Sequence, residues 1–352
     1  MSKTSEIIES KKHYGGITFL ERMKKCRTSA ISIAIIENFE ITETYVHGVK
    51  RRRTEEKVTP NTLFQAASIS KPVFAVALMR LAEQGKLDID TDISEYLVDY
   101  EISTFDKKKH KITLRQILSH RAGLNLHGFI GYKQGKKIPT VNQILTGKKP
   151  TNHSKLKLEK KPGTEEKYSG GGYVLAQKIM TDVCKLDFCE LMNDLVLTPL
   201  SMENSTFTQD LPEDKIHEVA FGYNSYNLQV SGGFKIMPEL SAAGLWTTPS
   251  DLALFGIEMM KALKGESVFL KKETAELMMT KAHENSNFGV GFRVFDEKKG
   301  LVFGHSGGNI GYRSNMCFCP ADASGMVVMV NSDKGVKMTT EITNAATEIF
   351  SW

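Results

Sequence analysis

Ser68, Ile69, Ser70 and Lys71 place a hydroxyl and an amine three residues apart. Residues at positions i and i+3 lie on one face of a helix, so the Lys71 amine can lie beside the Ser68 hydroxyl. A serine hydroxyl becomes a good nucleophile when a neighbouring base takes its proton, and an uncharged lysine in a dry pocket can be that base. This spacing therefore predicts nucleophilic catalysis by Ser68, with Lys71 in the proton-transfer machinery.

The residues after this tetrad predict a buried helix. Pro72 suits the first turn of a helix, where its missing N–H costs nothing. Apolar residues then recur at helical spacing between Val73 and Leu87. The positive end of the helix dipole would favour negative charge developing on Ser68. Taken alone, a Ser-x-x-Lys match often arises by chance, and Ser68 could equally be an ordinary helix N-cap.

A glycine-rich segment supplies a second candidate, Tyr168. Pro162-Gly163-Thr164 leads into Tyr168-Ser169-Gly170-Gly171-Gly172-Tyr173, which reads as a tight loop entering a helix. A lysine beside a tyrosine favours the phenolate through its positive charge, so Tyr168 could shuttle protons. The alternative is a tyrosine whose ring simply packs in the core.

A third segment, Gly304 to Gly311, lies between two strand-like runs. An edge strand here would offer an unpaired N–H as an oxyanion donor, with glycines that let a substrate approach the backbone. The same segment matches Gly-x-Ser-x-Gly, which would make Ser306 the nucleophile of an α/β-hydrolase. That motif needs a following helix and a later histidine. Strand-like residues follow Ser306 and no histidine follows His305, so we reject this alternative.

Composition narrows the class of protein. The 352 residues, 41% hydrophobic and 25% charged, fit a soluble globular protein of one large or two medium domains. No apolar run approaches the ~20 residues that span a bilayer, so we expect no membrane span. The first thirty residues lack the pattern of a signal peptide. We therefore expect a cytoplasmic protein, or the mature part of an exported one whose signal has been removed.

The charges and cysteines argue against a nucleic-acid-binding protein, a disulfide-rich protein and a zinc protein. The net charge is +5, and the basic runs carry neither interleaved aromatic residues nor a nucleic-acid motif, so a solvated surface is expected rather than nucleic-acid binding. Five cysteines are an odd number that does not suggest a disulfide framework. None lies at zinc-ligand spacing, and we expect no metal site and no cofactor.

Strand-like segments occur at both ends of the chain and helical ones between them. The expected strands are 31–37, 41–46, 291–295, 301–304, 314–318 and 325–330; the expected helices include 114–118, 173–184, 188–195, one after Pro249, and 339–350. This order predicts a sheet closed by strands distant in sequence, with a helical domain inserted into it. Residues 1–75 and 283–352 would form the discontinuous α/β sheet domain, and 76–282 the mostly helical insertion. The active site would lie in the cleft between them.

Many further motifs, from Ile31 to the C-terminus, resemble one family: the serine penicillin-recognising hydrolases of the class C β-lactamase type, with penicillin-binding-protein-like DD-peptidase, D-aminopeptidase and esterase relatives. The motifs besides the tetrad are Thr62-Leu63-Phe64, 81–87, 118–124, 162–164, 199–202, 243–248, 288–292 and His305-Ser306-Gly307. The resemblance implies the β-lactamase/transpeptidase-like fold, of class α/β plus α: an antiparallel sheet flanked by helices, with an inserted all-helical domain.

The resemblance also implies roles for residues. Ser68 would be the nucleophile, and Lys71 and Tyr168 the proton-transfer pair. The backbone N–H groups of Ser68 and Gly308 would form the oxyanion hole. His305, Ser306 and Gly307 match the triad on the strand that lines the substrate cleft opposite the helix.

Two departures from the family pattern concern substrate binding. Gly170 stands where relatives carry the asparagine that binds an acylamide side chain, and losing a buried hydrogen-bond partner costs ~1 to 3 kcal/mol. His305 replaces the lysine of the strand triad. Since an imidazole titrates near neutrality, binding of an anionic substrate should weaken as the pH rises through roughly 6 to 7. The alternative is that His305 has only a structural role in the strand and does not bind substrate.

The sequence thus predicts a serine hydrolase that acts through a Ser68 acyl-enzyme on an ester or on an amide or peptide. An esterase or a D-amino-acid peptidase or amidase fits better than an efficient β-lactamase. The alternative is a penicillin-binding sensor or a non-catalytic binding relative of the same fold. The expected partner is a small-molecule or peptide substrate, and the oligomeric state is left open.

Overall fold

The computed structural model describes residues 2–352, and its centre is a six-stranded antiparallel sheet in the order β2-β1-β10-β9-β8-β7. The strands are β1 (Ala30–Glu37), β2 (Glu40–Gly48), β7 (Arg293–Glu297), β8 (Gly300–Asn309), β9 (Tyr312–Cys319) and β10 (Ser324–Val330). Strand β1, near the start of the chain, pairs with β10, near its end. The predicted closure of the sheet by sequence-distant strands is confirmed.

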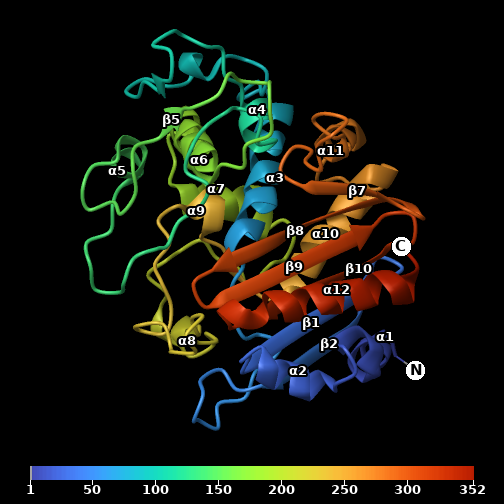
Figure 1. Ribbon diagram of the computed structural model, residues 1–352. Coiled ribbons are helices and arrows are strands. Elements are labelled where there is room, and N and C mark those ends of the chain that lie inside the picture. Colours follow the sequence, from blue (N-terminus) through green and yellow to red (C-terminus); the bar gives the residue numbers. More distant parts are fainter. Residues whose placement is uncertain (1) are drawn as a thin grey trace.

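Both faces of the sheet are buried, which explains the nearly continuous apolar runs of its central strands. Ile31, Ile33 and Ile35 of β1 pack in one apolar cluster with α1, α2 and α12. The alternate residues Ala30 and Ala34 belong to the larger cluster on the other face. Figure 1 shows α12 lying along the sheet. The helices of these two layers are α1 (Lys3–Glu9), α2 (Phe19–Lys25), α12 (Val336–Phe350) and, on the second face, α10 (Pro249–Lys264).

Most of the remaining helices gather at one end of the sheet in Figure 1, whereas α8 and α11 lie apart from that group. The remaining helices are α3 (Ser70–Glu83), α4 (Leu114–Leu118), α5 (Val141–Thr146), α6 (Gly170–Cys184), α7 (Phe188–Met192), α8 (Glu213–Ile216), α9 (Leu240–Ala243) and α11 (Lys272–Met279). Four short strands complete this part: β3 (Phe64–Gln65) pairs with β6 (Trp246–Thr247), and β4 (Ser103–Thr104) with β5 (Lys157–Leu158). Helix α3 is buried on nearly all sides, as expected of a helix that is apolar around most of its circumference.

Several expected boundaries shift in the structure, and three of these shifts have a clear local basis or place the site. Helix α3 ends at Glu83 rather than near Leu87, because Gly85 adopts a left-handed φ of 70° that turns the chain away. The helix expected over 188–195 is an α-helix over Phe188–Met192 that continues as a π turn over Asn193–Leu197. Strand β8 continues from Gly304 to Asn309, so the His305-Ser306-Gly307 triad lies within a strand.

Helix α10 lies in the interval assigned to the helical insertion, yet it packs against β1, β9 and β10. Gly256 permits this close packing: a Cβ built there would lie 2.1 Å from Cε1 of Phe318 on β9. The apolar cluster on this face runs without interruption from the sheet into α3 and α6. The division of the chain into a sheet domain and an inserted domain stays a prediction.

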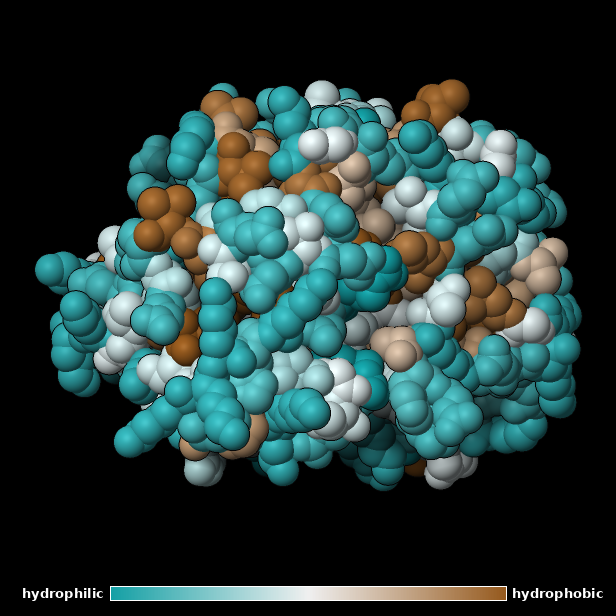
Figure 2. Space-filling view, turned by 90° about the horizontal axis from the view of Figure 1, so that it is seen from above, coloured by the Kyte–Doolittle hydropathy of each residue, from teal (hydrophilic) through white to brown (hydrophobic). Residues whose placement is uncertain are grey.

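The surface is predominantly polar. In Figure 2, hydrophilic side chains cover most of the face seen from above, and apolar ones form separate patches among them. The large apolar side chains that are exposed, such as Val98, Ile130 and Val268, are far apart in sequence. Among the described residues, no helix combines the length and apolarity needed to cross a bilayer.

The contact between α10 and β9 yields a stability test. Replacing Gly256 with alanine should destabilise the fold by roughly 1 to 2 kcal/mol. Overpacking a buried contact costs about 1 to 3 kcal/mol, which outweighs the gain of ~1 kcal/mol that alanine brings to a helix interior. Urea unfolding monitored by circular dichroism measures the difference.

The control is the double variant Gly256→Ala with Phe318→Leu. The smaller side chain removes the atoms that the new methyl group meets, so the two substitutions should be less than additive. A fully additive result would mean that the ring does not limit the approach of α10.

Candidate active site

Ser68 and Lys71 face one another at the beginning of α3. Ser68 lies in the 3-10 turn η2 (Ala67–Ile69), and Lys71 in the first turn of α3. The Lys71 Nζ atom is 3.1 Å from the Ser68 Oγ atom. The structure thus brings together the nucleophile and base expected from the i, i+3 spacing.

The Lys71 amine is held by the main chain of another element. Its side chain is only 2% exposed, and Nζ donates a 2.7 Å hydrogen bond to the carbonyl oxygen of Ala242 in α9. The rings of Tyr168 and Tyr173 lie 5.0 and 5.5 Å from Nζ. Burial among aromatic rings excludes bulk water from the amine and fixes its direction toward Ser68.

The residue before Ser68 has an unusual backbone conformation. Ala67 has a φ of 53°, the left-handed region that costs an L-residue about 1 to 2 kcal/mol. Such residues concentrate at active sites, where the surrounding structure holds them in place. Ser70, the other serine of the tetrad, is structural: its Oγ donates to the Ala67 carbonyl and accepts from the Leu245 N–H.

Strand β8 reaches the nucleophile turn because position 307 is a glycine. A Cβ at Gly307 would lie 2.1 Å from the carbonyl oxygen of Ala66, which no side chain tolerates. Ser314 on the neighbouring strand β9 donates a 2.8 Å hydrogen bond to the same carbonyl. Ser68, Ser306, Gly307 and Gly308 therefore line one cavity of about 450 Å³.

The expectation that the triad lies on an edge strand is correct for only part of β8. Strand β7 pairs with β8 from Gly300 to Gly304, and β9 pairs with it on its other side. From His305 onward, no described strand pairs with β8 on the β7 side, and the turn η2 packs against this part of β8. Ser306 and Gly308 are exposed to the cavity at this point. The oxyanion role of the Ser68 and Gly308 N–H groups remains a prediction.

Tyr168 lines the same cavity and is held between histidines. Its ring centroid is 4.0 Å from that of His120 and 4.8 Å from that of His127. The next residue, Ser169, caps α6 with its side chain, and its N–H donates to the Nδ1 atom of His120. Packing and capping thus direct Tyr168 toward the cavity that holds Ser68.

His305 is buried beside this cavity as a neutral imidazole. Its Nδ1 atom is 2.7 Å from the carbonyl oxygen of Ser306, which can only accept, so Nδ1 carries the proton. Burial, reinforced by the charge of Lys71, lowers the pKa of His305 to about 3. The imidazole therefore does not titrate between pH 6 and 7, and the expected weakening of anion binding in that range is wrong for this group. Its Nε2 atom is buried and has no hydrogen-bond partner among the described residues.

Gly170 does not line the cavity that contains Ser68. A Cβ built on Gly170 would lie 3.0 Å from Cε2 of Phe129 and 3.1 Å from the carbonyl oxygen of His127. The loop that carries these residues fills the direction in which a side chain at position 170 would project. A substrate-binding role for this position finds no support in the geometry.

Arg293 is a candidate that the sequence reasoning missed. It begins β7, directly after the motif that ends at Phe292, and it lines the cavity with Ser68. Its guanidinium carbon lies 4.9 Å from the Phe288 ring centroid, and it forms no ion pair with a described residue. Glu166 also lines the cavity, where it accepts a hydrogen bond from Ser286. Guanidinium groups keep their charge across the working range of enzymes, so Arg293 supplies the fixed cation that His305 cannot.

A second Ser-x-x-Lys, Ser154 to Lys157, lies elsewhere and shows how weak the motif is alone. Lys157 is in β5 and forms a 3.1 Å ion pair with Glu159, away from the cavity that contains Ser68. Over the described residues, no group of three or more His, Cys, Asp or Glu side chains is placed to hold a metal ion.

Comparison with known proteins identifies the class. The model of the family described as Beta-lactamase matches residues 18–348. Among curated relatives, Protein flp of Staphylococcus aureus strain MRSA252 is 24% identical over 322 residues, which cover 88% of this chain and 60% of the relative. Teichoic acid D-alanine hydrolase of Staphylococcus aureus is 24% identical over 221 residues, or 63% of this chain and 52% of that protein. The chain thus spans only about half to three fifths of these relatives.

Among solved structures, the D-amino acid amidase from Ochrobactrum anthropi SV3, complexed with L-phenylalanine amide, superposes with a TM-score of 0.78. The two chains are 20% identical, and the match covers 99% of this chain and 97% of the amidase. At this identity the likeness shows the fold alone. The fold is the β-lactamase/transpeptidase-like one expected from the sequence, and this chain belongs to the beta-lactamase family.

The buried histidines predict a dependence of stability on pH. Burial lowers the pKa of His305 to about 3 and that of His120 well below its usual value. The unfolded chain binds protons at both positions below about pH 6.5, whereas the folded chain does not, so acidification through that value favours unfolding. Each group should remove up to ~1.4 kcal/mol of unfolding free energy per pH unit until the folded state also binds its proton.

Urea unfolding between about pH 7 and pH 4.5 tests this for His305→Asn, whose amide can still donate to the Ser306 carbonyl. The free-energy difference between wild type and variant should shift steadily in favour of the variant as the pH falls. A difference independent of pH would show that His305 binds a proton equally well in both states.

Proposed function

We propose that this chain is a serine hydrolase that forms an acyl-enzyme on Ser68. The observation that carries the proposal is the 3.1 Å contact between the Lys71 Nζ and Ser68 Oγ atoms at the wall of the catalytic cavity, which we define as the cavity of about 450 Å³ that contains Ser68. A serine beside a base is the arrangement that nucleophilic catalysis requires. Because the chain belongs to the beta-lactamase family, a catalytic role explains this contact better than chance does.

The proposed reaction has two halves. Ser68 Oγ attacks the substrate carbonyl while Lys71 and Tyr168 take its proton, and the Ser68 and Gly308 N–H groups stabilise the oxyanion. The proton then goes to the leaving amine or alcohol as its bond to the carbonyl carbon breaks. In the second half, water attacks the acyl-enzyme and loses a proton to the same pair, which passes a proton to Ser68 Oγ as the ester bond breaks and the acid leaves.

The proposed substrate is an ester or amide of a D-amino acid whose leaving side carries a carboxylate. Arg293, with its unpaired guanidinium in the catalytic cavity, supports the carboxylate. The printed names of two similar proteins, a D-amino acid amidase and a teichoic acid D-alanine hydrolase, support the D-amino acid. The blocked position at Gly170 argues against the acylamide recognition expected of an efficient β-lactamase.

The first test removes the nucleophile and the base separately. Ser68→Ala should abolish both turnover of a p-nitrophenyl ester and formation of a covalent adduct with a fluorescent penicillin, detected by intact mass. Lys71→Ala should lose nearly as much, because residues that act as one proton-transfer unit have non-additive effects.

Ser306→Ala is the matched control, since this exposed serine lies in the same cavity but is not the proposed nucleophile. It should keep substantial activity. Covalent labelling that survives in Ser68→Ala would refute the acyl-enzyme proposal. Labelling of the wild type without release of the acid would favour a penicillin-binding sensor.

The second test concerns the carboxylate. Arg293→Gln should raise the Michaelis constant for the dipeptide D-alanyl-D-alanine by about 10-fold, since a hydrogen bond to a charged group contributes about 1.5 kcal/mol. The same variant should affect the C-terminal amide of that peptide little. Steady-state kinetics on the two substrates give the comparison.

Arg293→Lys is the conservative control and should restore part of the preference, because it keeps the charge but loses the planar fork. Equal losses on the acid and its amide would mean that Arg293 supports the fold of the site rather than the substrate carboxylate.

A further inference from the structure

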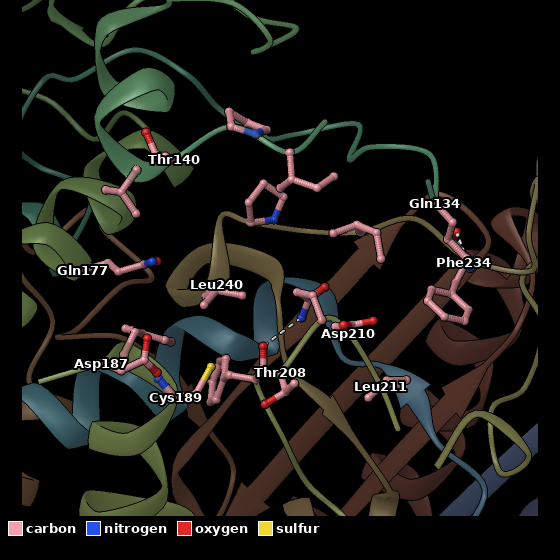
Figure 3. Close-up of a pocket in the computed structure, with 18 of the residues that line it drawn as sticks. Gln134, Thr140, Gln177, Asp187, Cys189, Thr208, Asp210, Leu211, Phe234 and Leu240 are labelled. Carbon is pink, nitrogen blue, oxygen red and sulfur yellow. Dashed lines mark hydrogen bonds between the residues drawn. The ribbon is translucent and has the colours of Figure 1, made fainter. Parts of the chain in front are cut away.

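A cavity of about 950 Å³ lies apart from the catalytic cavity and has no lining residue in common with it. We call it the second cavity. Its walls come from α6, the start of α7, and the segments 134–141, 207–211 and 234–240. Figure 3 shows side chains from these elements pointing into the space between them. The volume is at the upper end of the range typical of small-molecule sites.

The second cavity is mainly apolar. Phe188, Phe207 and Phe234 line it, and the rings of Phe188 and Phe207 meet edge to face at 5.3 Å. Leu211 and Leu240 extend this surface and are labelled in Figure 3. These side chains belong to the apolar core or pack against it, so the wall is a continuation of the folded core. Such a surface favours a ligand with an aromatic or aliphatic body.

The charged groups on the wall favour a cation. Asp187 and Asp210 line the second cavity, and neither forms an ion pair with a described residue. Both aspartates are exposed, and Asp187 also accepts the Cys189 N–H at 2.7 Å. Lys136 is a lining residue too, so two carboxylates face one ammonium group. The wall therefore carries a net negative charge beside its apolar surface.

The C-terminal end of α6 adds to the negative electrostatic potential of the second cavity. Thr181, in the last turn of α6, lines the second cavity, and the C-terminal end of a helix carries partial negative charge. The last turn of α6 contains no basic residue. Lys185, the C-cap residue, does not line the cavity.

We propose that the second cavity binds a small amphiphilic amine, with its apolar body against the phenylalanine rings and its ammonium group at Asp210. This site is distinct from the one at Ser68 and does not depend on the hydrolase activity. The apolar wall selects the body of the ligand, and the unpaired carboxylates select the sign of its charge.

Three probes of one shape test the proposal: phenylbutylamine, phenylbutanol and phenylbutyrate. Ligand-observed NMR titration of the wild type should rank their affinities with the amine first and the carboxylate last. Asp210→Asn should weaken binding of the amine roughly 2- to 5-fold, the range expected for an exposed ion pair, and leave the alcohol unchanged. Asp194→Asn removes the same charge from an exposed position outside the cavity and should have no effect.

A second variant tests the location. Cys189 lines the second cavity, so Cys189→Phe should fill part of it and abolish binding of the amine, while circular dichroism checks that the variant folds. Binding of the amine that persists in Cys189→Phe would place it elsewhere and overturn the proposal. So would the absence of binding, or an affinity for the alcohol or the carboxylate equal to that for the amine. If Cys189→Phe does not fold, the Asp210→Asn comparison decides.

Discussion

The burial of the Lys71 amine is the constraint on which the rest of the site depends. An amine with 2% exposure is costly unless it has hydrogen-bond partners, and the structure provides Ser68 and the carbonyl of Ala242. The second partner requires α9 to pack against α3. Ser241 of α9 is in turn fixed by the side chain of Gln177 and the carbonyl of Tyr173, both in α6. The positions of three helices thus follow from the need to satisfy one side chain.

Two residues of the catalytic cavity divide the roles that a lysine at position 305 would combine: one shapes the wall and the other carries positive charge. His305 is neutral and buried, so it shapes the wall without contributing charge in the working pH range. Arg293 reaches the same cavity from β7 and carries the charge. Under the proposed function, Arg293 rather than His305 would hold the substrate carboxylate.

Local spacing explains what could be predicted from the sequence. The Ser68 and Lys71 pair is set by the geometry of a single helical turn, and the strands at the chain ends show uninterrupted apolar runs. Features that depend on distant contacts could not be predicted. The Ala242 carbonyl has no sequence signal, the burial of His305 depends on surrounding elements, and Phe129 blocks Gly170 only because of the path of its loop. Arg293 directly follows the 288–292 motif, so extending this motif by one residue would have identified it.

Because the acceptor for Lys71 is a main-chain carbonyl, this hydrogen bond does not depend on the chemistry of the side chain at position 242, where burial leaves room only for a small one. Every amino acid carries this group, so no single codon change at position 242 can delete the hydrogen bond. Only a substitution that moves the backbone of α9 can do so. Selection at this contact therefore acts on the shape of a helix rather than on the identity of a residue. Relatives could keep the same base in place while the local sequence diverges, and an alignment column would understate the importance of position 242.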